Sequence, residues 1–132
     1  MFRGLIPVFL LGALVACGGV TDPSQNQNQP FNGTIQPGGF SDTFQFNASK
    51  SGEITIIVSS MNPTLPSGTF FEVVWGQVIS GQCGTISANS LAIVGATAVS
   101  SAITPGSYCV AVADVYNSFK TAEQFTMTVS HP

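Results

Sequence analysis

The sequence predicts an all-β domain, either a sandwich or a barrel, of about seven to nine short antiparallel strands. Three observations support this fold class. Apolar and polar residues alternate with a period of two in several short runs, turn residues such as Gly, Pro and Asn separate these runs, and no stretch has the spacing of an amphipathic helix. Hydrophobic residues make up 44% of the 132-residue chain, which is enough to form the core of one domain.

The strands of the predicted domain, residues 31–132, are placed by this alternation. They are expected at residues 31–35, 40–46, 53–59, 69–79, 107–115 and 124–129. In the second run, Phe40 lies on the same face as Phe44 and Phe46, and this face is expected to be buried. In the fourth run, the residues expected to face inward are Phe71, Val73, Trp75 and Ile79.

Two further segments lie between these runs. Residues 81–84, Gly-Gln-Cys-Gly, are expected to form a turn. Residues 91–103 are apolar but interrupted at Gly95, which favours two short strands. A helix at residues 96–102 is the alternative, although Thr97 and Val99 are poor helix formers.

The amino-terminal residues predict export. Residues 5–15 are apolar and follow Arg3, but a membrane-spanning helix needs about 20 apolar residues. The length suits the hydrophobic region of a signal peptide. Residues 14–17, Leu-Val-Ala-Cys, closely resemble the lipobox of bacterial lipoproteins. The resemblance implies that residues 1–16 are a lipoprotein signal peptide and that lipid on the Cys17 sulfur anchors the chain to the membrane.

Two details qualify this interpretation. Gly18 occupies the position at which aspartate favours retention in the inner membrane of enteric bacteria, so the resemblance implies the outer membrane. Ordinary secretion, with cleavage after Gly18, is the alternative. Residues 17–30 are predicted to be the lipidated cysteine and a flexible polar linker, because Val20 is the one apolar residue between Gly18 and Pro30.

Cysteine usage is consistent with an exported domain. Of the three cysteines, Cys17 is assigned to lipid, which leaves Cys83 and Cys109 as a possible disulfide. Such a bridge would close a loop of about 27 residues and contribute about 3 kcal/mol on the chain-entropy model. Two free thiols or a metal site are the alternatives, although two cysteines without a nearby histidine are too few ligands for zinc.

Several short motifs resemble those of bacterial pre-peptidase C-terminal domains. They are residues 31–35 (Phe-Asn-Gly-Thr-Ile), 38–39 (Gly-Gly), 44–46 (Phe-Gln-Phe), 52–56 (Gly-Glu-Ile-Thr-Ile), 105–110 (Pro-Gly-Ser-Tyr-Cys-Val) and 125–129 (Phe-Thr-Met-Thr-Val). In the last motif, phenylalanine stands where the family usually has tyrosine. The resemblance implies an antiparallel jelly-roll-like β-sandwich. Members are typically appended to secreted peptidases, whereas no peptidase precedes this domain in the sequence.

Composition excludes several functions. The chain has three Lys or Arg against six Asp or Glu, without a basic cluster, so nucleic acid is not an expected partner. The single histidine, His131, lies one residue from the end of the sequence, where it is expected to fray and be solvated. No cofactor motif or paired carboxylates suggest an enzyme. Calcium bound by Asp42 or Asp114 is an alternative without a supporting cluster.

Aromatic residues indicate two possible recognition sites. Tyr116 and Phe119 lie in a polar loop where they could stack on a sugar or hold a peptide, although they could also fold back over the domain. Phe70 is at a strand position expected to face outward, where it could extend an exposed patch or be buried by an opposing segment.

These observations together predict a non-enzymatic interaction or structural module, lipid-anchored to the bacterial cell envelope. Its partner would be an envelope protein or a glycan. A carbohydrate- or peptide-binding domain that uses the aromatic loop is the alternative, and a secreted hydrolase or its accessory domain ranks last.

Overall fold

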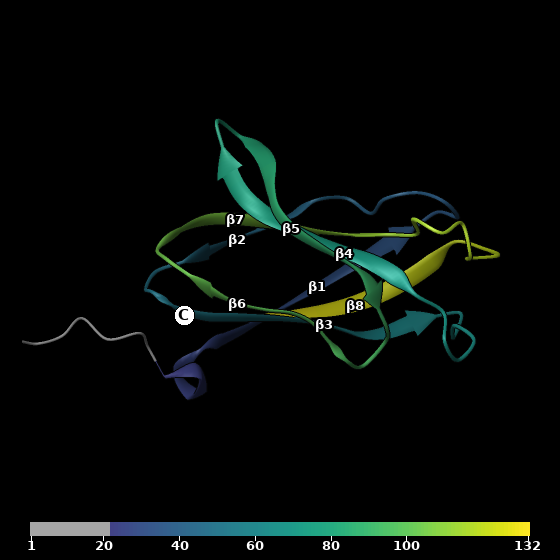
Figure 1. Cartoon of the computed structure of the whole chain (residues 1–132), viewed down its shortest axis with the longest axis horizontal. Coiled ribbons are helices and arrows are strands. Elements are labelled where there is room, and N and C mark those ends of the chain that lie inside the picture. The colour runs from purple at the N-terminus through teal and green to yellow at the C-terminus, as the bar shows by residue number, and fades with distance from the viewer. Residues whose placement is uncertain (1–21) are drawn as a thin grey trace, which may run out of the picture.

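The computed structural model describes residues 22–132, which form eight β-strands and one short 3₁₀ helix, Pro23–Gln25 (Figure 1). The leader and Cys17 lie outside the described residues. The strands are β1 (Gln27–Ile35), β2 (Phe44–Ala48), β3 (Gly52–Asn62), β4 (Phe71–Ile79), β5 (Gln82–Ala92), β6 (Thr97–Ile103), β7 (Gly106–Ala113) and β8 (Glu123–His131). The all-β prediction is confirmed for these residues.

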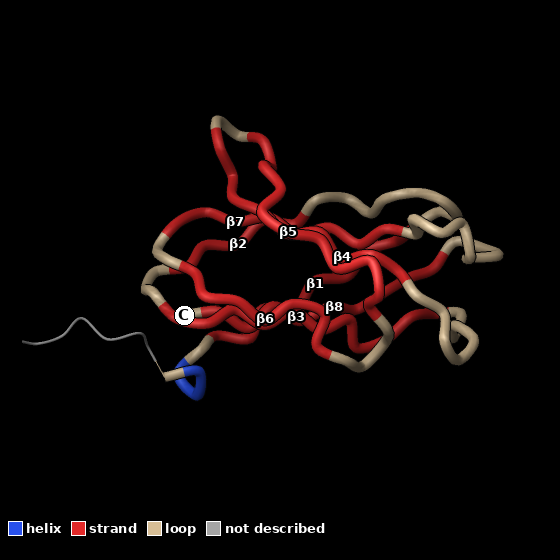
Figure 2. The backbone as a smooth tube through the Cα atoms, in the orientation of Figure 1, coloured by secondary structure: helices blue, strands red, loops and turns tan. Residues whose placement is uncertain are grey.

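The strands form two four-stranded antiparallel sheets that pack face to face (Figure 2). The first sheet has the order β1-β8-β3-β6 and the second has the order β2-β7-β4-β5. The chain changes sheet at every connection except the β4–β5 hairpin. This is the strand arrangement of an eight-stranded jelly roll, so the predicted jelly-roll-like β-sandwich is confirmed.

The core lies between the sheets and consists of the inward-facing residues of the alternating runs. Phe71, Val73 and Trp75 are buried as expected, but Ile79 is exposed. The β4–β5 hairpin projects beyond the opposing sheet (Figure 1), so no second layer covers Ile79. Phe40 is also exposed, because β2 begins only at Phe44 and Phe40 forms an isolated bridge with Ala113.

The β4–β5 hairpin differs from the sequence prediction in where it turns. Ser80 and Gly81 have φ angles of 51° and 77°, as a two-residue hairpin turn requires, and β5 then begins at Gln82. A disulfide joins Cys83 to Cys109 of β7, with 5.9 Å between their Cα atoms, which confirms the predicted pair. After β5 the chain turns at Gly95, with a φ of 84°, and residues 96–102 are not helical.

Strand β1 begins at Gln27, so the last four residues of the predicted linker belong to the sandwich. Gln27 pairs with His131 and Pro30 pairs with Thr128. His131 is buried rather than solvated: its ring centroid lies 5.0 Å from that of Phe46, and its Nε2 lies 3.2 Å from Oε1 of Gln29. The polar sequence hid this strand because β1 is an edge strand, where proline and glutamine are tolerated.

Candidate functional site

The loop predicted to carry two aromatic side chains connects β7 to β8 and is organised by Asp114. This side chain is 1% exposed, and both carboxylate oxygens accept hydrogen bonds. The donors are Gly38 N–H at 2.9 Å, Ser118 N–H at 2.9 Å, Ser118 Oγ at 3.2 Å and Phe119 N–H at 3.0 Å. Burial alone would raise the pKa of Asp114, but these donors outweigh it and hold the pKa below its ordinary value.

The structure separates the aromatic residues that were predicted to act in recognition. Tyr116 is 52% exposed, whereas Phe119 is 4% exposed and belongs to the hydrophobic core. Phe119 therefore packs against the core, which is the alternative in which the loop folds back over the domain, and recognition of a ligand by Tyr116 and Phe119 together stays a prediction. Phe70 is 42% exposed and lines an apolar groove of about 470 Å³ together with Ile93 and Val94.

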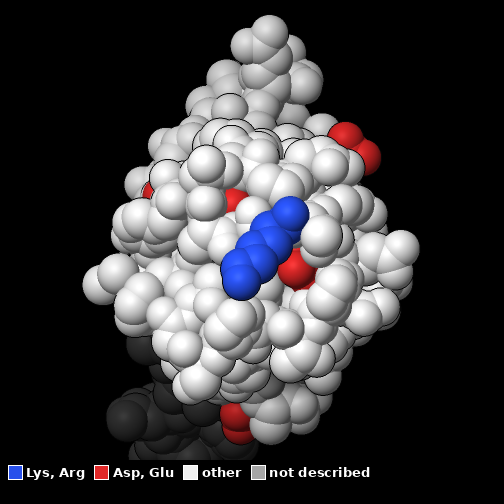
Figure 3. Space-filling model, turned by 90° about the vertical axis from the view of Figure 1, so that its right-hand side faces the viewer, with Lys and Arg blue, Asp and Glu red and all other residues white. Residues whose placement is uncertain are grey.

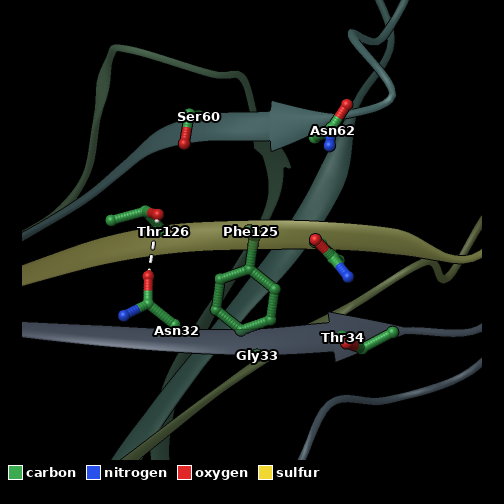
Figure 4. Close-up of a pocket in the computed structure, with 8 residues that line it drawn as sticks. Asn32, Gly33, Thr34, Ser60, Asn62, Phe125 and Thr126 are labelled. Atoms are coloured by element: carbon green, nitrogen blue, oxygen red, sulfur yellow. Dashed lines mark hydrogen bonds between the residues drawn. The ribbon is translucent and has the colours of Figure 1, made fainter.

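A polar hollow lies on the outer face of the first sheet, at the end where β1 stops and β8 begins (Figure 4). Its volume is about 460 Å³. The register places its side chains in two ranks across three strands. One rank is Thr34, Gln124 and Asn62, and the other is Asn32, Thr126 and Ser60. Within the second rank, Thr126 Oγ1 donates a hydrogen bond of 2.9 Å to Asn32 Oδ1.

Two local features shape the hollow. In β3 the register shifts between Val58 and Ser60, so that Ser59 is an extra residue. This bulge keeps Met61 in the core while Ser60 and Asn62 point outward.

Beneath the hollow, a glycine lets an aromatic ring lie against the backbone of β1. A Cβ atom on Gly33 would lie 2.7 Å from Cζ of Phe125, so only glycine leaves room for that ring. Phe125 is buried on the core side of its strand and belongs to the hydrophobic core. The floor of the hollow therefore rests on a closely packed layer.

The chemistry of the hollow is that of neutral hydrogen bonding. Among the described residues that line it there is no Asp, Glu, Lys, Arg or His. Amide and hydroxyl groups each donate and accept hydrogen bonds, which matches the hydroxyl groups of a sugar. The lining offers no acid, base or activated nucleophile. Sequence reasoning did not single out these positions as a site, although Asn, Gln and Thr in place of Lys and Glu were a usable signal.

Other classes of site are limited in the part of the chain that the structure describes. Residues 22–132 contain no group of three His, Cys, Asp or Glu that could hold a metal ion. None of the helices in this range has the length and apolar character needed to cross a membrane.

Comparison with known proteins adds no assignment. No family model matches the chain, and no curated protein matches it significantly. The similarity of residues 31–129 to pre-peptidase C-terminal domains therefore stays a prediction from short motifs. What the site can do follows from its residues and their geometry.

Proposed function

We propose that this protein is a non-enzymatic binding module of the bacterial cell envelope, anchored by lipid on Cys17, which binds uncharged glycan in the polar hollow. The proposal rests on one observation. The hollow gathers three amide side chains, Asn32, Asn62 and Gln124, with three hydroxyl side chains on one sheet face and excludes charge. Such a surface can exchange its hydrogen bonds to water for hydrogen bonds to sugar hydroxyls without burying an ion.

The placement of the hollow supports the anchored arrangement. The chain enters the sandwich at Gln27, and the hollow lies near Thr34 at the other end of β1. Seven residues of strand separate these points by about 23 Å. An anchor attached through the entering segment would therefore leave the hollow at the end of the domain that is farther from the membrane.

Glycan binding is tested with the full-length protein purified in detergent. The probes are neutral cello-, chito- and malto-oligosaccharides, titrated while backbone amide signals are followed by NMR. We expect saturable shifts at Asn32, Asn62 and Gln124 with at least one series. Asn62→Ala and Gln124→Ala should each weaken binding about tenfold, because each removes an amide that makes about 1.4 kcal/mol of hydrogen bonding.

The matched control is Gln45→Ala, which removes an exposed amide from the outer face of the second sheet. It should leave the affinity unchanged. Failure of all three oligosaccharide series to shift the hollow, or equal losses in the control, would contradict the proposed ligand class.

The anchor is tested separately by intact mass of the membrane fraction from the native host, with and without reductant. The expected mass begins at Cys17 and includes acyl chains. A soluble product without acyl chains would contradict the anchor and leave a secreted binding module.

A further inference from the structure

A second pocket, distinct from the polar hollow, lies between the β3–β4 loop and the β7–β8 loop. Its volume is about 280 Å³. The residues that line it include the apolar Pro63, Leu65, Pro66 and Phe119 and the charged Lys120 and Glu123.

Glu123 is unusual among the carboxylates of the described chain. It is the first residue of β8, is 4% exposed, and pairs with Ile35 of β1. Its Oε2 atom is buried without a hydrogen-bond partner. An unsatisfied buried polar group costs about 1–3 kcal/mol, and burial raises the pKa of Glu123 above its ordinary value.

Lys120 provides the complementary charge. It is exposed and forms no ion pair within 4.0 Å with another residue of 22–132. Figure 3 views this end of the molecule and shows a basic side chain lying across the surface with acidic side chains beside it. The residues that line the pocket thus include a glutamate whose Oε2 atom has no hydrogen-bond partner, a lysine without an ion pair, and several apolar side chains.

We propose that this pocket binds a zwitterionic α-amino acid with a branched aliphatic side chain. Its ammonium group donates hydrogen bonds to Glu123, its carboxylate pairs with Lys120, and its side chain packs against Leu65, Pro66 and Phe119. L-Leucine is a small ligand that combines these three groups.

Other ligand classes fit these residues less well. An anion would face the carboxylate of Glu123. A metal ion would find too few ligands, because no group of three His, Cys, Asp or Glu occurs in residues 22–132. A simple amine would satisfy Glu123 but would leave Lys120 without a partner and place two cations together.

The test is an NMR titration of the full-length protein in detergent with three probes of similar shape. L-Leucine carries both charges, isoamylamine carries only the ammonium group, and 4-methylpentanoate carries only the carboxylate. We expect saturable shifts at Phe119, Lys120 and Glu123 with L-leucine. Isoamylamine should bind at least tenfold more weakly, and 4-methylpentanoate should not saturate.

Variants assign the two charges. Glu123→Gln should weaken L-leucine binding at least tenfold, and Lys120→Ala should reduce it to the affinity of isoamylamine. Glu72→Gln, on β4 and outside the set of residues that line the pocket, should leave the affinity unchanged. The proposal is overturned if L-leucine produces no saturable shift, if Glu123→Gln binds L-leucine as tightly as the native protein, or if 4-methylpentanoate binds as well as L-leucine.

Discussion

Asp114 and Glu123 stand at the two ends of the same connection, between β7 and β8, and both are buried. Asp114 accepts four hydrogen bonds, from Gly38, Ser118 and Phe119, and its pKa is lowered. Glu123 has an oxygen with no partner, and its pKa is raised. Burial opposes the charged form in both, so the donors decide the difference.

The comparison distinguishes two uses of a buried carboxylate. At Asp114 the charge holds backbone N–H groups that would otherwise have no partner, and it therefore fixes the loop. Glu123 lines a pocket, and its buried Oε2 atom has no hydrogen-bond partner. The first arrangement contributes to stability, and the second reduces stability while keeping a group ready for a ligand.

The largest expected effect is that of Asp114→Asn. An amide cannot accept from all the donors around this position, and its own N–H₂ group would face backbone N–H groups. We expect a loss of about 3 kcal/mol in the free energy of unfolding at pH 7, measured by urea denaturation. Asp42→Asn, at an exposed carboxylate, should change the free energy of unfolding by less than about 0.5 kcal/mol. Similar losses in both variants would contradict the special role of Asp114.

The pH dependence of stability tests the same point with the native protein. Because the pKa of Asp114 is lowered on folding from its ordinary value of 3.8, its contribution is fully present above that value. The contribution is lost as the pH falls through the lower pKa of the folded state. The native protein should therefore approach the stability of Asp114→Asn as the pH falls below the lowered pKa of the folded state. A constant difference between the two proteins from pH 7 to pH 2 would count against the lowered pKa.

A smaller effect of opposite sign is expected for Glu123→Gln, which removes a buried charge while keeping the shape of the side chain. Because the pKa of Glu123 is raised from 4.5, the native protein is penalised when the pH rises through the higher pKa of the folded state. The variant should be more stable by about 1 kcal/mol at pH 7, and this gain should shrink towards pH 4. Thermal unfolding at both pH values measures the change. A loss of stability at pH 7 would show that Glu123 has a structural role.

The sequence predicted much of the fold because the sandwich is built from period-two alternation, as in β4 and β8. The prediction failed where a strand forms through backbone pairing with its neighbour and has no pattern of hydrophobic residues. Gln27 and Pro30 carry no apolar signal, and they are in a strand only because β8 lies beside them. Ile79 has the same parity in the alternating pattern as the buried residues of β4, but it is exposed. This parity leads to burial only where a second sheet faces the strand.

The candidate sites were less accessible to sequence reasoning, for a related reason. Asn62 and Gln124 come from separate strands and are neighbours only because of the register between β3 and β8. The bulge at Ser59 shifts that register by one residue. Glu123 looked like any other surface carboxylate, because its burial depends on two loops that converge from distant parts of the sequence. The sequence singled out Phe119 as a candidate for recognition, but an aromatic residue in a loop can pack in the core as well as contact a ligand.

The smallest expected effect divides the contribution of Asp114 between backbone and side-chain donors. Ser118→Ala removes the hydroxyl that donates at 3.2 Å, while the N–H groups of Ser118, Phe119 and Gly38 remain bonded to the carboxylate. Since three donors are retained, the free energy of unfolding should fall by about 0.5–1 kcal/mol at pH 7, as measured by urea denaturation. The loss should be absent in the Asp114→Asn background if the hydroxyl acts only through this carboxylate. Equal losses in the two backgrounds would mean that Ser118 stabilises the loop independently of Asp114.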